Sequence, residues 1–92
     1  MKEIKETNKF VIYKIEGAYK RSIIGTKLTS EGFKFIEARN SSRISYNGND
    51  AGEQWYYIHS TKKFTGDLTD ILFVRKNSQL EKIAKEIIER ID

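Results

Sequence analysis

The sequence predicts one α+β domain spanning residues 1–92, in which an antiparallel sheet of about five strands carries a C-terminal amphipathic helix on one face. The length of 92 residues is typical of one domain, since single domains most commonly contain about 100 residues. Short β-branched and aromatic segments, separated by Gly, Asn and Ser, recur along most of the chain. Residues 77–92 instead place apolar side chains at helical spacing. Strands followed by one helix are typical of the α+β class.

The beginning of the chain predicts a hairpin. Residues 9–16 are rich in β-branched and aromatic side chains and stop at a glycine, so they predict a first strand. Residues 22–28 have a similar composition and predict a second strand. Residues 17–21 then form the turn between them.

Residues 29–40 fit either a strand or a short helix. Ser30 is a suitable helix cap, and apolar residues follow it at helical spacing. Gly32 near the start of such a helix, and the alternation of Phe33 and Phe35, favour a strand instead. We therefore expect a strand here, while the helix remains the alternative.

The middle of the chain predicts two further strands around a loop. Residues 43–46 read as a short strand, and residues 47–52 combine Gly, Asn and Asp as an exposed loop does. Residues 54–61 carry aromatic side chains on both alternating faces, so we expect a central strand. Residues 70–76 predict the last strand of the sheet.

The segment 77–92 is predicted to be a helix that covers the sheet. The stretch from Ser78 to Glu81 has the capping-box pattern, in which the serine caps the helix and the glutamate folds back on its start. A stripe of this kind can face a partner or a membrane, but we expect it to pack on the domain's own core. The stripe consists of Leu80, Ile83, Ala84, Ile87, Ile88 and Ile91.

The composition excludes several classes of function. The absence of cysteine excludes disulfides, Fe–S clusters and thiol catalysis. His59 is the only histidine, and no nucleophile-elbow pattern accompanies it. The loop at 47–52 departs from the calcium-binding pattern at its first and fifth positions. We therefore expect a protein that is not an enzyme and holds neither metal nor cofactor.

The sequence also bears on location. Residues 1–6 contain no apolar run of the kind found in a signal peptide, and no stretch approaches the ~18 apolar residues that span a bilayer. We expect a cytoplasmic protein without a membrane partner.

The distribution of charge and aromatic residues suggests nucleic-acid binding. The chain has 17 basic and 13 acidic residues, a net charge of +4, and residues 10–47 alone hold seven basic and three acidic residues. Aromatic rings on the sheet face opposite the helix would stack on bases, while cations meet phosphates. The predicted nucleic-acid-binding residues are Lys20, Arg21, Lys34, Arg39, Arg43, Tyr46, Trp55, Tyr57 and Arg75.

Phe33 and Phe35 are expected in the core, but if one of them is exposed, its ring can also stack on a base. Two other readings stay open for the aromatic face. Trp55 and Tyr57 can shield the open sheet, or be buried between two copies in a homodimer. The chain can also be a small interaction module or inhibitor, encoded on a phage or mobile element, that covers a host protein's surface.

Overall fold

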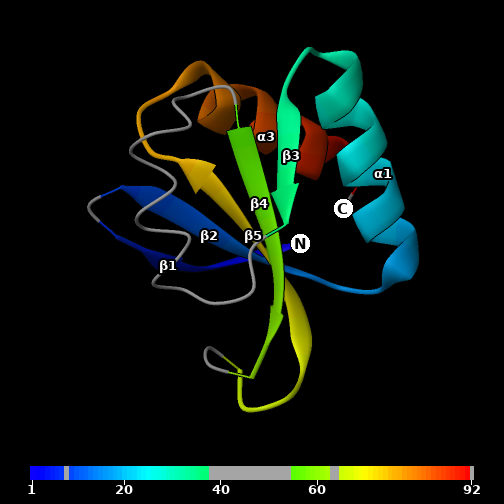
Figure 1. Ribbon diagram of the computed structural model, residues 1–92, viewed down its shortest axis with the longest axis vertical. Coiled ribbons are helices and arrows are strands. Elements are labelled where there is room, and N and C mark those ends of the chain that lie inside the picture. Colours follow the sequence, from blue (N-terminus) through cyan, green and yellow to red (C-terminus); the bar gives the residue numbers. More distant parts are fainter. Residues whose placement is uncertain (8, 38–54, 63–64, 92) are drawn as a thin grey trace.

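The computed structural model describes residues 1–7, 9–37, 55–62 and 65–91. The described residues form a five-stranded sheet, and helices pack against it (Figure 1), so the predicted α+β class and C-terminal helix are confirmed. None of the helices described is long and apolar enough to cross a membrane. The elements are β1 (Lys2–Glu6), β2 (Phe10–Ile15), α1 (Ala18–Ser30), β3 (Lys34–Glu37), β4 (Trp55–Thr61), β5 (Thr69–Arg75) and α3 (Gln79–Ile91).

The sheet has the order β1-β2-β5-β4-β3. Neighbouring strands are antiparallel except for β3 and β4, which are parallel, so the sheet is mixed where the sequence suggested an antiparallel one. The physical reason is α1, which links β2 to β3 as a crossover and so lets β3 run in the same direction as β4. β1 was not predicted, and it pairs with β2 at the end of this order.

The predictions of a strand at 22–28 and a turn at 17–21 are wrong, because residues 18–28 are helical and belong to α1. Gly17, with φ at 99°, is the N-cap of this helix. Ile24 and Leu28 lie one helical turn apart and are both fully buried. Burial of these two side chains outweighs the strand preference of the β-branched residues around them.

The ambiguous segment 29–40 begins as the end of α1 and continues as β3. Gly32 adopts φ 94°, and its N–H donates to the Thr29 carbonyl at 3.0 Å. The Phe33 N–H donates to the Leu28 carbonyl at 3.0 Å, and both side chains lie in the same core. This is a Schellman motif, the usual glycine-dependent end of a helix.

The remaining strand predictions have two outcomes. The strands predicted at 9–16, 54–61 and 70–76 are confirmed as β2, β4 and β5. β4 lies between β5 and β3, as expected for a strand with aromatic residues on both faces. The strand predicted for 43–46 and the loop predicted for 47–52 lie outside the described residues.

α3 begins as its sequence predicts. The Glu81 N–H donates to Ser78 Oγ at 3.2 Å, while Glu81 Oε1 accepts from the Asn77 N–H at 3.3 Å. The Glu81 carboxylate thus accepts from the N–H of Asn77, the residue that precedes the serine cap, whereas the capping-box pattern uses the N–H of the cap residue itself. The apolar stripe faces the domain's own core, with Leu80, Ala84, Ile87 and Ile88 buried.

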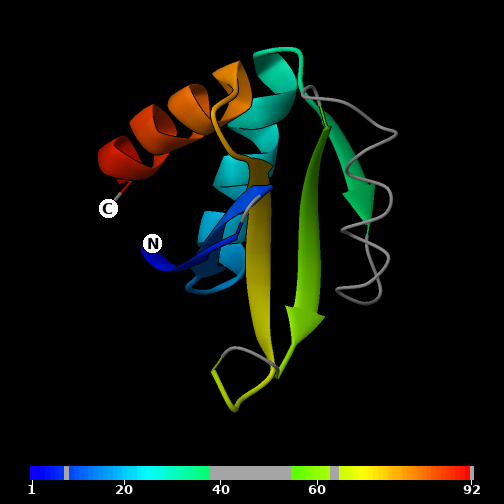
Figure 2. The same cartoon turned by 90° about the vertical axis from the view of Figure 1, so that its left-hand side faces the viewer.

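The core has two parts, one on each face of the sheet. α1 and α3 lie on the same side of the sheet, as Figure 2 shows, and with β2, β4 and β5 they form the helix-side core. The opposite face carries a smaller cluster of tightly packed rings and aliphatic side chains. Its members are Phe10, Ile12, Tyr57, Ile71 and Phe73.

Candidate functional site

Two of the predicted nucleic-acid-binding residues meet on β3 and β4. Lys34 and Trp55 are partners in the parallel β3–β4 pairing, and Lys34 Nζ lies 5.4 Å from the centroid of the Trp55 ring. Lys34 is exposed and Trp55 is half-buried. A cation over an indole face is held by the ring's negative electrostatic potential. The two strands therefore bring a cation and a ring together at the surface.

Tyr57 and Arg75 lie on the same sheet face as Trp55, and Tyr57 belongs to the packed cluster of that face. The Tyr57 ring is 1% exposed and packs at right angles to Phe10, with ring centroids 5.8 Å apart. Arg75 is half-buried, and its Nη1 has no hydrogen-bond partner within the described part of the chain. In this conformation the Tyr57 ring offers no face to a base.

Lys20 and Arg21 lie on α1, on the other side of the sheet from Trp55. Arg21 Nη1 lies 3.2 Å from Asp70 Oδ1, and the same oxygen accepts a hydrogen bond from Ser60 Oγ. Arg21 thus ties α1 to the sheet. The other predicted residues, Arg39, Arg43 and Tyr46, lie outside the described residues.

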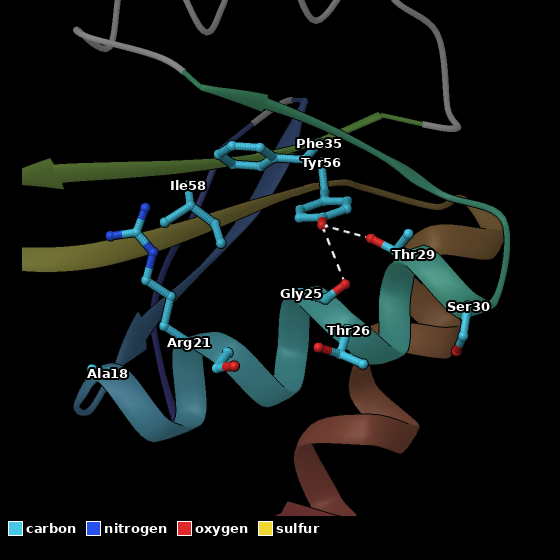
Figure 3. Close-up of a pocket in the computed structure, with 10 residues that line it drawn as sticks. Ala18, Arg21, Gly25, Thr26, Thr29, Ser30, Phe35, Tyr56 and Ile58 are labelled. Atoms are coloured by element: carbon cyan, nitrogen blue, oxygen red, sulfur yellow. Dashed lines mark hydrogen bonds between the residues drawn. The ribbon is translucent and has the colours of Figure 1, made fainter.

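A groove of about 760 Å³ lies between α1 and the β3–β4 pair, and we term it the α1–β3 groove. Figure 3 shows its two sides. The sheet contributes Phe35, Tyr56 and Ile58, and α1 contributes residues between Ala18 and Ser30. Pockets that bind small molecules usually measure about 300–1,000 Å³. The groove is therefore large enough for such a ligand.

Tyr56 closes one end of the α1–β3 groove. Its ring reaches from β4 to α1, where Tyr56 Oη donates to the Gly25 carbonyl at 3.4 Å and lies 3.3 Å from Thr29 Oγ1 (Figure 3). Arg21 extends from α1 toward the sheet near Ile58 and forms the other end. The two ends are fixed by hydrogen bonds and by the Arg21–Asp70 ion pair.

Phe35 supplies an exposed ring to this groove. It is 42% exposed, and its ring centroid lies 5.6 Å from that of Tyr56 at a tilt of 42°. Phe33, by contrast, is 9% exposed and belongs to the core. The expectation that both rings are buried is therefore wrong for Phe35, whose register partner Tyr56 takes the buried position beside it. Phe35 is the ring of this pair that remains available for stacking.

The helix beside the groove is basic. Between Ala18 and Ser30, α1 contains Lys20, Arg21 and Lys27 and no acidic residue. The described residues that line the groove include no carboxylate, and hydroxyl groups are numerous on its α1 side. Within the described part of the chain, no group of three or more His, Asp or Glu side chains is placed to hold a metal ion. The arrangement suits a flat ligand with polar or negative groups.

The groove is not predicted from the sequence, because the residue pattern indicates a turn at 17–21 and a strand at 22–28 in place of α1. Gly25 and Thr29 face Tyr56 only when residues 18–30 are helical. The sequence feature that could have indicated α1 is Gly32. A glycine commonly follows the last residues of a helix, so Gly32 fits the end of a helix better than its start.

Comparison of the chain with protein-family models, curated proteins and solved structures gave no match. A function for the chain must therefore be argued from the chemistry of its own surfaces.

Proposed function

We propose that this chain is a small, non-enzymatic protein that binds single-stranded nucleic acid along β3. The observation that carries the proposal is the pair of exposed neighbours Lys34 and Phe35. Strand alternation sends Lys34 to one face with Trp55 and Phe35 to the other with Tyr56. β3, at the end of the sheet order, thus presents a cation on one face and an aromatic ring on the other.

The chemistry of such a strand suits a flexible polyanion. Base stacking on an aromatic side chain is worth about 1–3 kcal/mol and depends little on sequence, because every base has a flat face. Lys34 provides a contact for phosphate, and Lys20 and Lys27 contribute to the positive charge of α1. This proposal retains Lys20, Lys34 and Trp55 from the sequence prediction and adds Phe35 and Lys27.

Single strands fit this surface better than duplexes. Bases in a duplex are stacked and paired, so their faces do not reach a ring such as Phe35. Phe35 lines the α1–β3 groove and is 42% exposed. An unpaired base reaches it without distortion of a double helix.

The test is fluorescence anisotropy of a labelled, mixed-sequence single-stranded oligonucleotide at several salt concentrations. The slope of log K against log[salt] is negative, and because Lys34→Gln removes one phosphate contact, this slope should become shallower by about 0.7. Lys85→Gln is the matched control. This substitution makes the same change in charge on α3, where Lys85 Nζ lies 3.6 Å from Glu81 Oε2. It should leave the salt dependence unchanged.

Failure of the oligonucleotide to bind at low salt would refute the proposal. Equal slopes for Lys34→Gln and Lys85→Gln would show that any binding occurs elsewhere on the molecule. The competing interpretation is a protein-interaction module, whose largely apolar contacts would depend far less on salt.

A further inference from the structure

Gly25 lies in the middle of α1 and forms part of the groove wall. Glycine weakens a helix interior relative to alanine. Packing does not require it here, because an added Cβ would meet only the Tyr56 hydroxyl, at an ordinary contact distance of 3.8 Å. The effect of Gly25 is to leave the α1–β3 groove open between Tyr56 and Arg21.

The surfaces that face this opening suit a planar ring. Phe35 and Ile58 lie on the sheet side, with the Phe35 face partly exposed, and Gly25 lies opposite them on α1 (Figure 3). A flat group that enters between them replaces water on apolar surface from both sides. Tyr56 limits how far it can slide along the helix.

The polar groups of the groove indicate what the ring carries. Ser22 and Thr29 bring hydroxyl groups, which both donate and accept hydrogen bonds. Arg21 stands at the far end, and its contact with Asp70 uses Nη1, one of the three guanidinium nitrogens. The described residues that line the groove include no carboxylate, and the Asp70 carboxylate is held by Arg21 Nη1 at 3.2 Å.

We infer that the α1–β3 groove binds one nucleotide unit, with the base between Phe35 and Gly25 and the phosphate toward Arg21. The unit is either a free mononucleotide or one residue of a bound strand. The second case rests on the proposed function, whereas the first does not. The same groove chemistry serves both, so the experiment has one arm for each.

The first arm is titration of the ¹⁵N-labelled protein with adenosine 5′-monophosphate, followed by amide chemical shifts. We expect saturable shifts at the amides of Arg21, Gly25 and Phe35. Gly25→Leu places a side chain in the groove and should abolish these shifts, while a residue with better helix propensity keeps α1 folded. Phe35→Ala should weaken binding by about 5- to 150-fold, the range expected for loss of one stacked base.

Tyr19→Ala is the matched control. Tyr19 is an aromatic residue on α1 that is 79% exposed and does not line the groove. The nucleotide affinity of this variant should equal that of the wild type. Loss of binding equal to that of Phe35→Ala would overturn the inference, as would the absence of saturable shifts at millimolar nucleotide.

The second arm repeats the oligonucleotide titration with Gly25→Leu, and its outcomes separate the two proposals. Weaker strand binding, together with loss of mononucleotide binding, supports the groove as the base site in a strand. If Gly25→Leu binds the strand with wild-type affinity, and the unmutated protein does not bind the mononucleotide, the inference is overturned but the proposed function stays intact. Mononucleotide binding without any strand binding supports the free-nucleotide case and refutes the proposed function.

Discussion

Tyr13 shows what burial does to a single residue. Its side chain is 4% exposed in the helix-side core, and its hydroxyl has no hydrogen-bond partner within the described part of the chain. Burial, supported by the negative charges of Glu3 and Glu81, raises the pKa of Tyr13 from 10.0 to about 12. The protein therefore holds this proton more tightly when it is folded.

This pKa predicts how stability depends on alkaline pH. The unfolded chain loses the Tyr13 proton near pH 10 and the folded chain only near pH 12, so stability falls as pH rises through this window and is unaffected below it. Relative to Tyr13→Phe, the wild type should lose roughly 1 kcal/mol by about pH 11, and up to about 3 kcal/mol at the end of the window. Urea denaturation at several pH values measures the difference.

Tyr19→Phe serves as the control for this pH dependence, because Tyr19 is 79% exposed and should leave the wild-type profile unchanged. If Tyr13→Phe lost stability between pH 10 and 12 as steeply as the wild type, Tyr13 would not be the group responsible.

Strand alternation predicts the face on which a residue lies but not what covers it. It correctly placed Trp55 and Tyr57 on one face of β4. The burial of Tyr57 depends on Phe10 and Phe73, which come from two other strands and pack around it. A single sequence does not show how strands are ordered in the sheet, so Tyr57 was predicted as an exposed ring.

At the scale of elements, α1 and α3 differ in how plainly they can be predicted. Six apolar residues of α3 follow helical spacing after a capping box, whereas α1 buries Ile24 and Leu28 and starts at Gly17 without a side-chain cap. Gly25 and the β-branched residues around it resemble a strand. α1 is helical because the tertiary core needs its two buried side chains, and local sequence does not carry that information.

The N-terminus of α3 gives the prediction at this scale. Ser78 Oγ accepts from the Glu81 N–H and donates to the Arg75 carbonyl at 2.5 Å, so it joins the end of β5 to the start of α3. Ser78→Ala removes both bonds at a residue that is 9% exposed, and should cost about 1–2 kcal/mol in unfolding free energy. The shift of the urea midpoint measures this cost.

Ser30→Ala is the control for the Ser78 variant. Ser30 Oγ donates to the Lys27 carbonyl at the exposed end of α1, so its loss should change stability by less than about 0.5 kcal/mol. Equal effects of the two substitutions would contradict the capping role of Ser78.

At the scale of the whole molecule, the α1–β3 groove exists only once distant segments have come together. Gly25 belongs to α1, Phe35 to β3 and Tyr56 to β4, and the crossover through α1 is what brings the helix beside the last two strands. The predicted hairpin would have placed Gly25 in a strand. The fold class could thus be predicted from local patterns, but the groove could not, because it depends on sheet order.

The shared helix-side core predicts that the domain unfolds as one unit. α1, α3 and three strands contribute to this core, and Ile87 of α3 is 6% exposed within it. Ile87→Ala should lower the unfolding free energy by about 2–5 kcal/mol. Far-UV circular dichroism reports on the helices, and the fluorescence of Trp55, the only tryptophan, reports on β4.

The two signals should have the same midpoint in the wild type, and in Ile87→Ala both should shift together, because loss of one core contact destabilises every element that shares the core. Lys82→Ala, at an exposed position of the same helix, should change the unfolding free energy obtained from either signal by no more than about 0.5 kcal/mol. A helical signal that shifted without the Trp55 signal would mean that α3 unfolds separately from the sheet. An unchanged midpoint in Ile87→Ala would mean that the stripe does not contribute to this core.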